Sequence, residues 1–361
     1  MVVENKNVAF AKEVLDRLID KQRVALYKPI QVAEILYRAR HGELSVSDIR
    51  ENLEAYRNPS KRWRDSVTRL LINQVSTSSQ KYQDNLFEAN AIPPAILAVL
   101  AKENNRYGGV VERYIYQQFW KKQQRILRLD ELLAKATIDD FNLTEFLSAF
   151  EYERGIRRSI DKAYEIVVYA LFNTLVRHLR IKVTLAANLA QIDLLRAFED
   201  FTRLLLGIDS QSPTVSLDAR LYRAGATNAA DRGLDIWANF GPVVQVKHLS
   251  LTYELAENIC EEVAADWIVI VCKDAEREII ERVSQQLGQR VRGIITETDL
   301  TRWYDEALLG KFADLLGKDL LGSLRQEFQN EFSYSKTLEG FYKEREYDRV
   351  PKSSSPFWCS D

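Results

Sequence analysis

The stretch that decides the fold is Arg232–Lys247, which reads RGLDIWANFGPVVQVK. Two short runs rich in β-branched and aromatic residues, LDIWANF and VVQVKHLSL, flank a Gly-Pro pair, which predicts two neighbouring strands joined by a tight turn. Side chains alternate between the two faces of a strand, so Gln245 and Lys247 share one face. Because Asp235 lies on the preceding strand, the three polar side chains can converge.

An acidic side chain, a second oxygen donor and a lysine at one edge of a sheet are suited to metal-dependent hydrolysis. We expect Asp235 and Gln245 to hold Mg²⁺, which prefers oxygen ligands. We expect Lys247 to orient the nucleophile or to offset developing negative charge. The three-residue pattern is short and can arise by chance. The alternative interpretation is a strand with a surface lysine and an aspartate beside a turn.

The rest of the chain frames this segment as part of an α/β domain. Downstream, WIVIVCK and VRGIIT read as strands that alternate with the helical patterns YELAENICEEVAA and AEREIIERVSQQLG, and upstream PTVSLDARLYR reads as a further strand. This order predicts a mixed sheet flanked by helices and followed by a helical tail. The first 180 residues show helical periodicity almost throughout. We therefore expect a mainly α-helical domain at 1–182 and an α/β domain at 183–361.

The composition excludes several classes of protein. The chain has 361 residues, of which 46% are hydrophobic and 28% charged, a globular balance that argues against disorder. Its three cysteines lack the spacing of a zinc site or a disulfide scaffold. We expect His248 to be packed or at the surface rather than catalytic. With neither a signal peptide nor a bilayer-spanning run in sight, the sequence favours a cytoplasmic protein without a membrane partner.

The motif Asp235…Gln245-x-Lys247 resembles that of the PD-(D/E)xK nuclease superfamily, in the variant with Gln in place of the second acid. The wider segment NAADRGLDIWANFGPVVQVKHLSL is similar to type II restriction endonucleases of the HaeII-like family. The N-terminal stretch NPSKRWRDSVTRLLINQVSTSSQKYQDNLFEANAIPPAIL is similar to the same family. The resemblance covers most of the chain, which makes it far more specific than the three-residue motif.

The resemblance implies a PD-(D/E)xK-type sheet and Mg²⁺-dependent cleavage of both strands of duplex DNA at the symmetric sequence RGCGCY. It also implies a homodimer, and no small-molecule cofactor besides the metal. Carried over residue by residue, Asp235 and Gln245 are metal ligands and Lys247 is the catalytic lysine. Many members also have a Glu on the helix before the first strand, and Glu199 matches it. Because Gln245 carries no charge, metal binding is weaker unless Glu199 or Asp218 adds a carboxylate; for Asp218 a simple strand-edge charge is the alternative.

A basic helix in the N-terminal half is the first candidate for DNA contact. The patterns QVAEILYRAR and VSDIRENLEAY predict two short helices, and a tight turn leads into SKRWRDSVTRLLIN. This order is typical of a helix-turn-helix or winged-helix module, whose last helix lies in the major groove. The expected DNA contacts are Lys61, Arg62, Arg64 and Arg69. The alternative is an ordinary solvated helix face.

A second basic run lies at residues 106–128, where Lys121 and Lys122 are expected to contact phosphates while the interleaved aromatic rings pack in the core. By contrast, residues 254–281 carry nine acids against two basic residues. We expect those helices to cover the back of the sheet, away from DNA. The formal net charge of −2 therefore averages over segregated regions.

These observations predict a two-domain type II restriction endonuclease that acts on double-stranded DNA. A palindromic site offers two equivalent half-sites, so a homodimer follows from the resemblance. Two alternatives stay open at this point. One is a modification-dependent or repair nuclease of the same superfamily, and the other is a non-catalytic DNA-binding protein with a nuclease-like fold.

Overall fold

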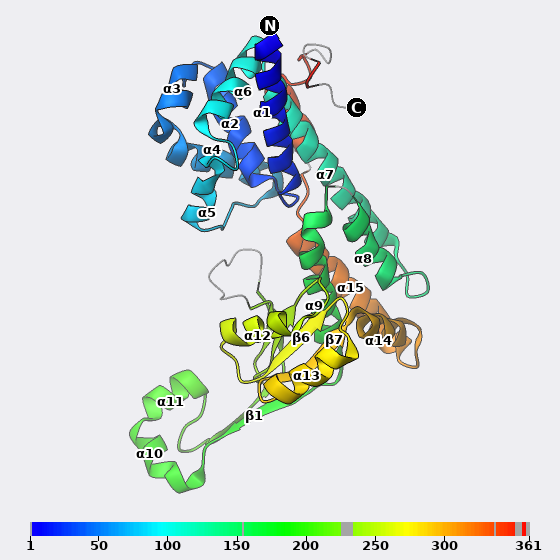
Figure 1. The fold of residues 1–361 in the computed structure, drawn as a ribbon. Helices are drawn as coiled ribbons and strands as arrows, with labels where there is room; N and C mark the ends of the chain where they lie inside the picture. The colour runs from blue at the N-terminus through cyan, green and yellow to red at the C-terminus, as the bar shows by residue number, and fades with distance from the viewer. Residues whose placement is uncertain (1, 154, 225–233, 336, 351–355, 359–361) are drawn as a thin grey trace.

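The computed structural model describes residues 2–153, 155–224, 234–335, 337–350 and 356–358 (Figure 1). The chain forms three parts. We call residues 2–119, together with 337–350 and 356–358, the head. The described residues of 120–181 and 219–335 form the body, and residues 182–218 form the arm.

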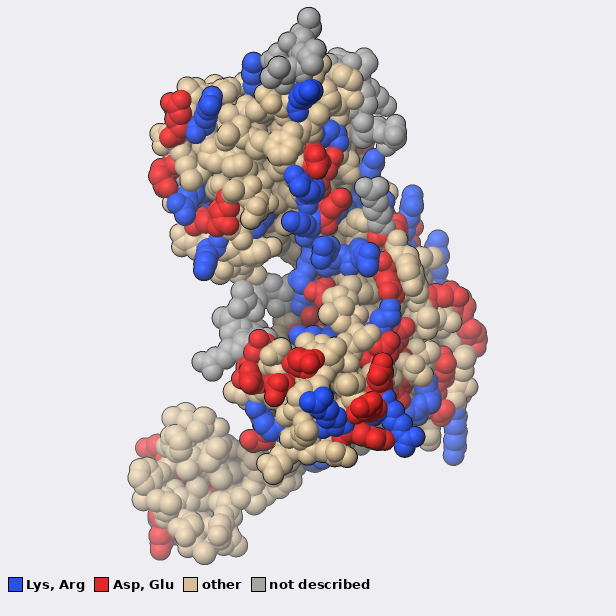
Figure 2. Space-filling view, in the orientation of Figure 1, with Lys and Arg blue, Asp and Glu red and all other residues tan. Residues whose placement is uncertain are grey.

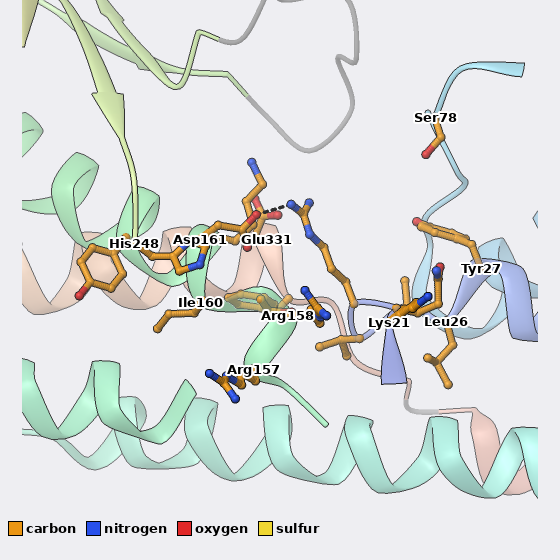
Figure 3. A pocket seen from close by; sticks show the side chains of 18 of the residues that line it. Lys21, Leu26, Tyr27, Ser78, Arg157, Arg158, Ile160, Asp161, His248 and Glu331 are labelled. Carbon is orange, nitrogen blue, oxygen red and sulfur yellow. Dashed lines mark hydrogen bonds and ion pairs between the residues drawn. The ribbon is translucent and has the colours of Figure 1, made fainter. Parts of the chain in front are cut away.

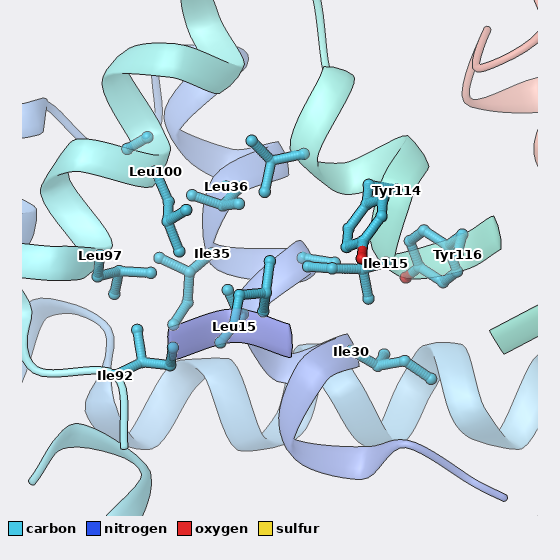
Figure 4. Close-up of a cluster of buried hydrophobic side chains, with 14 of the residues drawn as sticks. Leu15, Ile30, Ile35, Leu36, Ile92, Leu97, Leu100, Tyr114, Ile115 and Tyr116 are labelled. Atoms are coloured by element: carbon cyan, nitrogen blue, oxygen red, sulfur yellow. The ribbon is translucent and has the colours of Figure 1, made fainter. Parts of the chain in front are cut away.

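The head consists of helices that enclose one hydrophobic core, as the helical periodicity predicts. Its helices are α1 (Val2–Asp20), α2 (Tyr27–Arg40), α3 (Val46–Glu51), α4 (Arg57–Ile72), α5 (Gln80–Asp84), α6 (Pro94–Arg106), the first part of α7 (Val110–Lys135), and α16 (Leu338–Glu344) near the C-terminus. Leu15, Ile35, Leu100 and Ile115 are fully buried where these helices meet (Figure 4). Burying such side chains on one face of each helix is the main force that holds short helices together.

The C-terminal segment returns to the head. Phe341 of α16 and Trp358 pack in the same core as α1 and α7, and the ring of Tyr116 lies 4.9 Å from that of Phe341. Both ends of the described chain therefore lie in the head (Figure 1).

Long helices connect the head to the body. Helix α7 begins in the head and runs down to α8 (Leu143–Tyr152) and α9 (Ile160–His178), beside α14 (Glu297–Leu309) and α15 (Ala313–Glu331) (Figure 1). Most of α9 is apolar, and Ile166, Val167 and Leu171 are fully buried in the body core. This core also includes side chains of the sheet, so α9 is the element against which the candidate site is built.

The body contains a five-stranded sheet, and its mixed character confirms the sequence expectation. The strands, in spatial order, are β3 (Leu221–Arg223), β4 (Ile236–Ala238), β5 (Val243–Val246), β6 (Ile268–Cys272) and β7 (Val291–Thr296). Strands β3, β4 and β5 pair antiparallel, whereas β5, β6 and β7 pair parallel. Strand β6 is an uninterrupted apolar run because both of its faces are covered.

Helices cover the two faces of the sheet. Helices α9, α14 and α15 share one hydrophobic core with Val244 and Val246. Helices α12 (Tyr253–Glu262) and α13 (Arg277–Leu287) share another with Val243 and Ile270, on the opposite side chains of the same strands. The acidic helices therefore lie across the sheet from α9.

The arm is a feature that the sequence did not predict. Strand β1 (Lys182–Ala186) pairs antiparallel with β2 (Thr214–Asp218), and two short helices, α10 (Ile192–Ala197) and α11 (Glu199–Leu206), fold between them at the tip (Figure 1). The run PTVSLDARLYR, expected to be one strand, is therefore split. Its first half pairs within the arm as β2, and its second half joins the main sheet as β3.

The hydrophobic cores group the chain differently from the expected division at residues 182 and 183. Helices α8 and α9 share the core of the sheet rather than that of the head. The boundary itself stays a prediction. In the part of the chain that the structure describes, no helix is both long and apolar enough to cross a membrane.

Candidate active site and DNA-binding cleft

Asp235 lies immediately before β4, and a cross-strand hydrogen bond holds its carboxylate. Its Oδ2 atom accepts from the backbone N–H of Val246 on β5, at 2.8 Å. The ladder between the two strands ends at the pair Ile236 and Val244, so Asp235 and Gln245 are the next residues along each strand. Neighbours across an antiparallel pair project to the same face. The structure thus brings together the two residues expected to bind metal.

Gln245 and Lys247 differ in their exposure. Gln245 is only 1% exposed, whereas Lys247 is partly buried just beyond the end of β5. The backbone N–H of Lys247 donates to the carbonyl of Val271 at 2.8 Å, which fixes its position beside β6. Burial raises the pKa of the Asp235 carboxyl, although the Val246 amide and the charge of Lys247 oppose that shift. The lysine therefore stands close enough to Asp235 for its charge to be felt there.

Helix α9 adds an acid that the sequence reasoning missed. Glu165 is buried, and both of its carboxylate oxygens accept hydrogen bonds from Nζ of Lys162, at 2.6 and 2.8 Å. Burial raises the pKa of Glu165 to about 7, and the negative charge of Asp235 adds to the rise. One signal was available: Glu165 is the only charged residue in the run AYEIVVYALF. A lone acid inside an apolar helix is rarely buried without a partner.

An arginine on β3 ties this acid to the opposite helix. The Arg223 side chain donates to Glu327 at 2.9 Å and to Glu331 at 2.8 Å, both on α15, and its Nη1 atom lies 3.9 Å from Glu165. Arg223 and Glu331 are nearly buried, so the ion pairs are shielded from water. The network fixes α9, β3 and α15 around the acidic pair.

The donor set suits a hard divalent cation. Asp235 and Glu165 supply carboxylates with raised pKa values, and Gln245 supplies an amide oxygen on the neighbouring strand. The charge of Asp235 adds to the raised pKa of Glu165, and a cation bound near both carboxylates would stabilise their charged forms. The charge of Lys162 lowers the pKa of both. Among the described residues, no group of three or more His, Cys, Asp or Glu could hold a metal, so any such site depends on Gln245 or on water.

The other two acids proposed for the metal lie elsewhere. Glu199 begins α11 in the arm, where its Oε1 atom accepts hydrogen bonds from the hydroxyl and the backbone N–H of Ser210. Asp218 ends β2 and forms an exposed ion pair with Lys182. Its backbone carbonyl accepts from Asn239, which follows the end of β4 opposite Asp235. The structure therefore brings neither acid to Asp235, whereas Glu165 of α9 lies close enough for the charge of Asp235 to raise its pKa.

A cleft of about 1090 Å³ separates the head from this site (Figure 3). Its walls come from the link between α1 and α2, from the start of α9, and from the segments that follow β5 and β6. The basic residues that line it are Lys21, Arg23, Arg157, Arg158, Lys162 and Lys273. His248 also lines it and is partly buried, and burial lowers its pKa. Since Lys162 contacts Glu165 and His248 follows Lys247, the cleft leads to the candidate site.

Charged side chains are also unevenly distributed over the surface. Figure 2 shows Lys and Arg gathered at the waist between head and body, while Asp and Glu are interspersed with Lys and Arg over the rest of the visible body. Arg157 and Arg158, just before α9, are both exposed. A basic cleft of this kind favours a polyanion.

The basic helix of the predicted helix-turn-helix is α4, and its basic side chains differ in burial and in their partners. Arg64 is 1% exposed and donates to Gln31 and Gln83, both at 3.0 Å, so it is a core residue and cannot contact DNA as expected. Lys61 forms an ion pair with Asp84. Arg62 and Arg69 are exposed. A winged-helix module stays a prediction.

The two lysines of the second basic run also differ in their exposure to solvent. Lys122 is buried, and its Nζ atom donates to the carbonyls of Ile19 and Gln22, at 3.1 and 2.8 Å. Burial lowers the pKa of Lys122 to about 8. It completes the C-terminal end of α1 and is not placed to contact a phosphate, contrary to expectation. Lys121 is exposed.

Comparison with known proteins gives one consistent result. A family model described as HaeII restriction endonuclease matches residues 11–347. The type II restriction enzyme HaeII of Haemophilus aegyptius is 48% identical over 349 residues, which cover 95% of this chain and 98% of that protein. The type II restriction enzyme NgoBI of Neisseria gonorrhoeae is 48% identical over 327 residues, covering 89% and 91% respectively. No solved structure matches the chain.

Proposed function

The chain belongs to the HaeII restriction endonuclease family and is a type II restriction enzyme, a site-specific deoxyribonuclease. From this premise we propose that it acts in the cytoplasm and requires Mg²⁺. We propose that it cuts both strands of DNA at the palindrome RGCGCY. We also propose that its sheet is of the PD-(D/E)xK type. The observation that carries the proposal is the placement of Asp235 next to Gln245 across the β4–β5 pair, near the charge of Lys247. Glu165 of α9 lies close enough to Asp235 for the two charges to interact.

We propose Asp235, Gln245 and Glu165 as the residues that hold the metal. When bound, Mg²⁺ supplies positive charge that polarises the scissile phosphate and lowers the pKa of water. Asp235 keeps its orientation because one oxygen is anchored to the Val246 amide, which leaves the other available. Gln245 contributes no charge, so the second carboxylate has to come from Glu165. Lys162, the ion-pair partner of Glu165, carries its ammonium group on a flexible chain of methylene groups. The ammonium group can therefore turn toward the cleft that Lys162 lines and free the carboxylate for the metal.

Lys247 acts on the reacting groups directly in this proposal. Its ammonium group donates hydrogen bonds to the attacking water and offsets the negative charge that grows on the phosphate oxygens. The backbone N–H of Lys247 is bonded to Val271 of β6, so binding restricts mainly the freedom of the lysine side chain. Partial burial strengthens its charge interactions relative to those at an open surface.

DNA lies across the basic cleft between head and body in this proposal. Phosphates contact Arg157, Arg158 and Lys21, which line the cleft on both sides. The exposed Arg62 and Arg69 of α4 reach toward the bases or the neighbouring backbone. Each chain carries one candidate site, and cutting both strands of a palindrome calls for two of them. The proposal is therefore a homodimer with two-fold symmetry.

One digest tests this function. A plasmid with mapped RGCGCY sites is incubated with the purified chain, with Mg²⁺ or with EDTA, and the ends are sequenced. We expect double-strand breaks only at RGCGCY and only with Mg²⁺. Breaks at another sequence reject the specificity, and breaks in EDTA reject the metal requirement. Unmethylated and methylated plasmids run in parallel exclude a modification-dependent nuclease if the unmethylated plasmid is cut.

A further inference from the structure

The arm exposes an unusual amount of apolar surface. Nine large apolar residues between 182 and 218 are at least 39% exposed. The six most exposed are Leu189, Leu194, Phe198, Phe201, Leu204 and Leu205, and Leu204 reaches 89%. In Figure 2 the end of the arm shows few charged side chains. With roughly 150 Å² for a large apolar side chain, the nine expose on the order of 800 Å². Soluble monomers rarely leave a patch of that size uncovered.

The arm has little core of its own to hold it together. Within it only Leu195 and Ile208 are large apolar residues less than 9% exposed. An isolated two-stranded hairpin is marginally stable in water, and helices of six and eight residues do not persist alone. The arm therefore needs a covering partner to keep the conformation that the structure shows.

The described residues of head and body do not cover these side chains. The 20 residues outside the described ranges include none of Leu, Ile, Val, Phe, Tyr or Trp. Figure 1 shows that the arm projects away from head and body. A second molecule can supply the cover.

Nucleic acid fits this surface poorly. The arm carries three basic and five acidic residues. Each of the three basic side chains is already paired with an acid of the arm: Lys182 with Asp218, Arg196 with Asp193, and Arg203 with Glu199 and Asp209. An arm that is largely apolar and whose three basic side chains are already paired matches another apolar surface better than it matches phosphates.

We infer that the arm is the contact through which two copies of this chain associate, with the α10–α11 tip of each packed on its partner. The exposed apolar area of one arm is of the same order as the roughly 800 Å² that each partner buries in a standard interface. A two-fold contact uses the same patch on both copies, so a self-complementary apolar surface suffices. This inference rests on the homodimer of the proposed function and names the segment that forms it.

Sedimentation velocity of the full chain without DNA tests the inference. We expect the wild-type chain at micromolar concentration to sediment as a dimer, at twice 41.7 kDa. Leu204→Asp places a charge on the most exposed apolar residue of the arm and should weaken the dimer at least 100-fold. The residue is 89% exposed, so the monomer keeps its fold, which circular dichroism verifies. Leu132→Asp is the matched control, because Leu132 is 63% exposed on α7, and it should sediment like the wild type.

A second variant tests the inference if the dimer tolerates the single substitution Leu204→Asp. Ala186 pairs with Thr214, so residues 187–213 can be replaced by Asn-Gly, which closes the hairpin and removes the tip. This variant should be a monomer. A monomeric wild type, or a tip-deleted chain that dimerises with wild-type affinity, overturns the inference. Cleavage assays separate the two claims. A wild type that dimerises through the arm without cutting DNA contradicts only the cleavage function. A monomer that cuts at RGCGCY contradicts the inference and the proposed homodimer, but not the cleavage function.

Discussion

The Oδ2 atom of Asp235 accepts a hydrogen bond from the backbone N–H of Val246 at 2.8 Å. This bond joins the two strands that carry the candidate site and holds one carboxylate oxygen in place. An amide donor favours the ionised carboxyl, whereas burial raises the pKa of Asp235 and prevails. The site thus holds a well-oriented acid whose charge lacks full compensation, which is a reason for it to take up a cation.

Replacing Lys247 with alanine should abolish cleavage and spare sequence-specific binding. The side chain follows β5 at the edge of the site, and its removal takes away the charge that faces the phosphate. Loss of one such group costs about 100- to 1,000-fold in rate. A plasmid digest measures cleavage, and a gel shift measures binding. Lys343→Ala on the head is the control, since that residue is 67% exposed and far along the chain. Cleavage by Lys247→Ala at the wild-type rate contradicts the assignment.

Metal binding should depend on Glu165 and on pH. With the pKa of Glu165 raised to about 7, a cation must displace a proton at pH 6 but not at pH 8. We expect the Mg²⁺ affinity to rise about tenfold over that interval, measured by calorimetry. Glu165→Gln should weaken binding and flatten the pH dependence. Glu199→Gln tests the rival assignment from the sequence and should leave both unchanged; the reverse pattern would restore Glu199 as the ligand.

The same acid predicts how metal-free stability varies with pH. The folded state holds a proton on Glu165 up to about pH 7, whereas the unfolded chain releases it near 4.5. The folded state therefore binds more protons in this window, and the free energy of unfolding falls as pH rises from about 4.5 to about 7. The full contribution is about 3 kcal/mol. Urea unfolding across this range measures it, and a slope that persists in Glu165→Gln shows that another group is responsible.

Several elements were predictable because their signals are local. Strand β6 is an apolar run between turn residues, and the helices around it carry clear amphipathic patterns. The arm was missed because β1 pairs with β2 across 27 intervening residues, and neither strand has a buried face to give a strict alternation. No short-range sequence pattern predicts such a pairing.

The candidate site likewise contains residues that could be predicted from the sequence and residues that could not. Asp235, Gln245 and Lys247 are close in sequence, so alternation along two strands was enough to bring them together. Glu165 comes from a helix about 70 residues earlier, and only tertiary packing places it there. The burial of Arg64 was also hidden, because charge along one helix does not reveal that Gln31 and Gln83 from other helices cover it.

Arg64 and Arg62 form a matched pair on α4 with opposite expected effects. Arg64→Ala leaves Gln31, Gln83 and Asp65 without their donor in a buried place, and should cost about 3 kcal/mol of stability. Arg62→Ala removes an exposed side chain and should change stability by less than about 0.5 kcal/mol. Thermal unfolding measures both. In a gel shift, Arg62→Ala should bind DNA more weakly by about tenfold; wild-type binding contradicts a DNA contact for α4.

Removing the two arginines just before α9 tests whether DNA uses the cleft. Arg157 and Arg158 are exposed and line the cleft beside the candidate site. If each contacts one phosphate, the double alanine variant should lower the slope of log affinity against log salt by about 1.8. Affinity should fall uniformly for specific and non-specific duplexes, because phosphates carry no sequence information. Arg277→Ala is the control, since that residue is 92% exposed on α13, across the sheet from α9. An unchanged salt slope in the double variant would place the DNA outside the cleft.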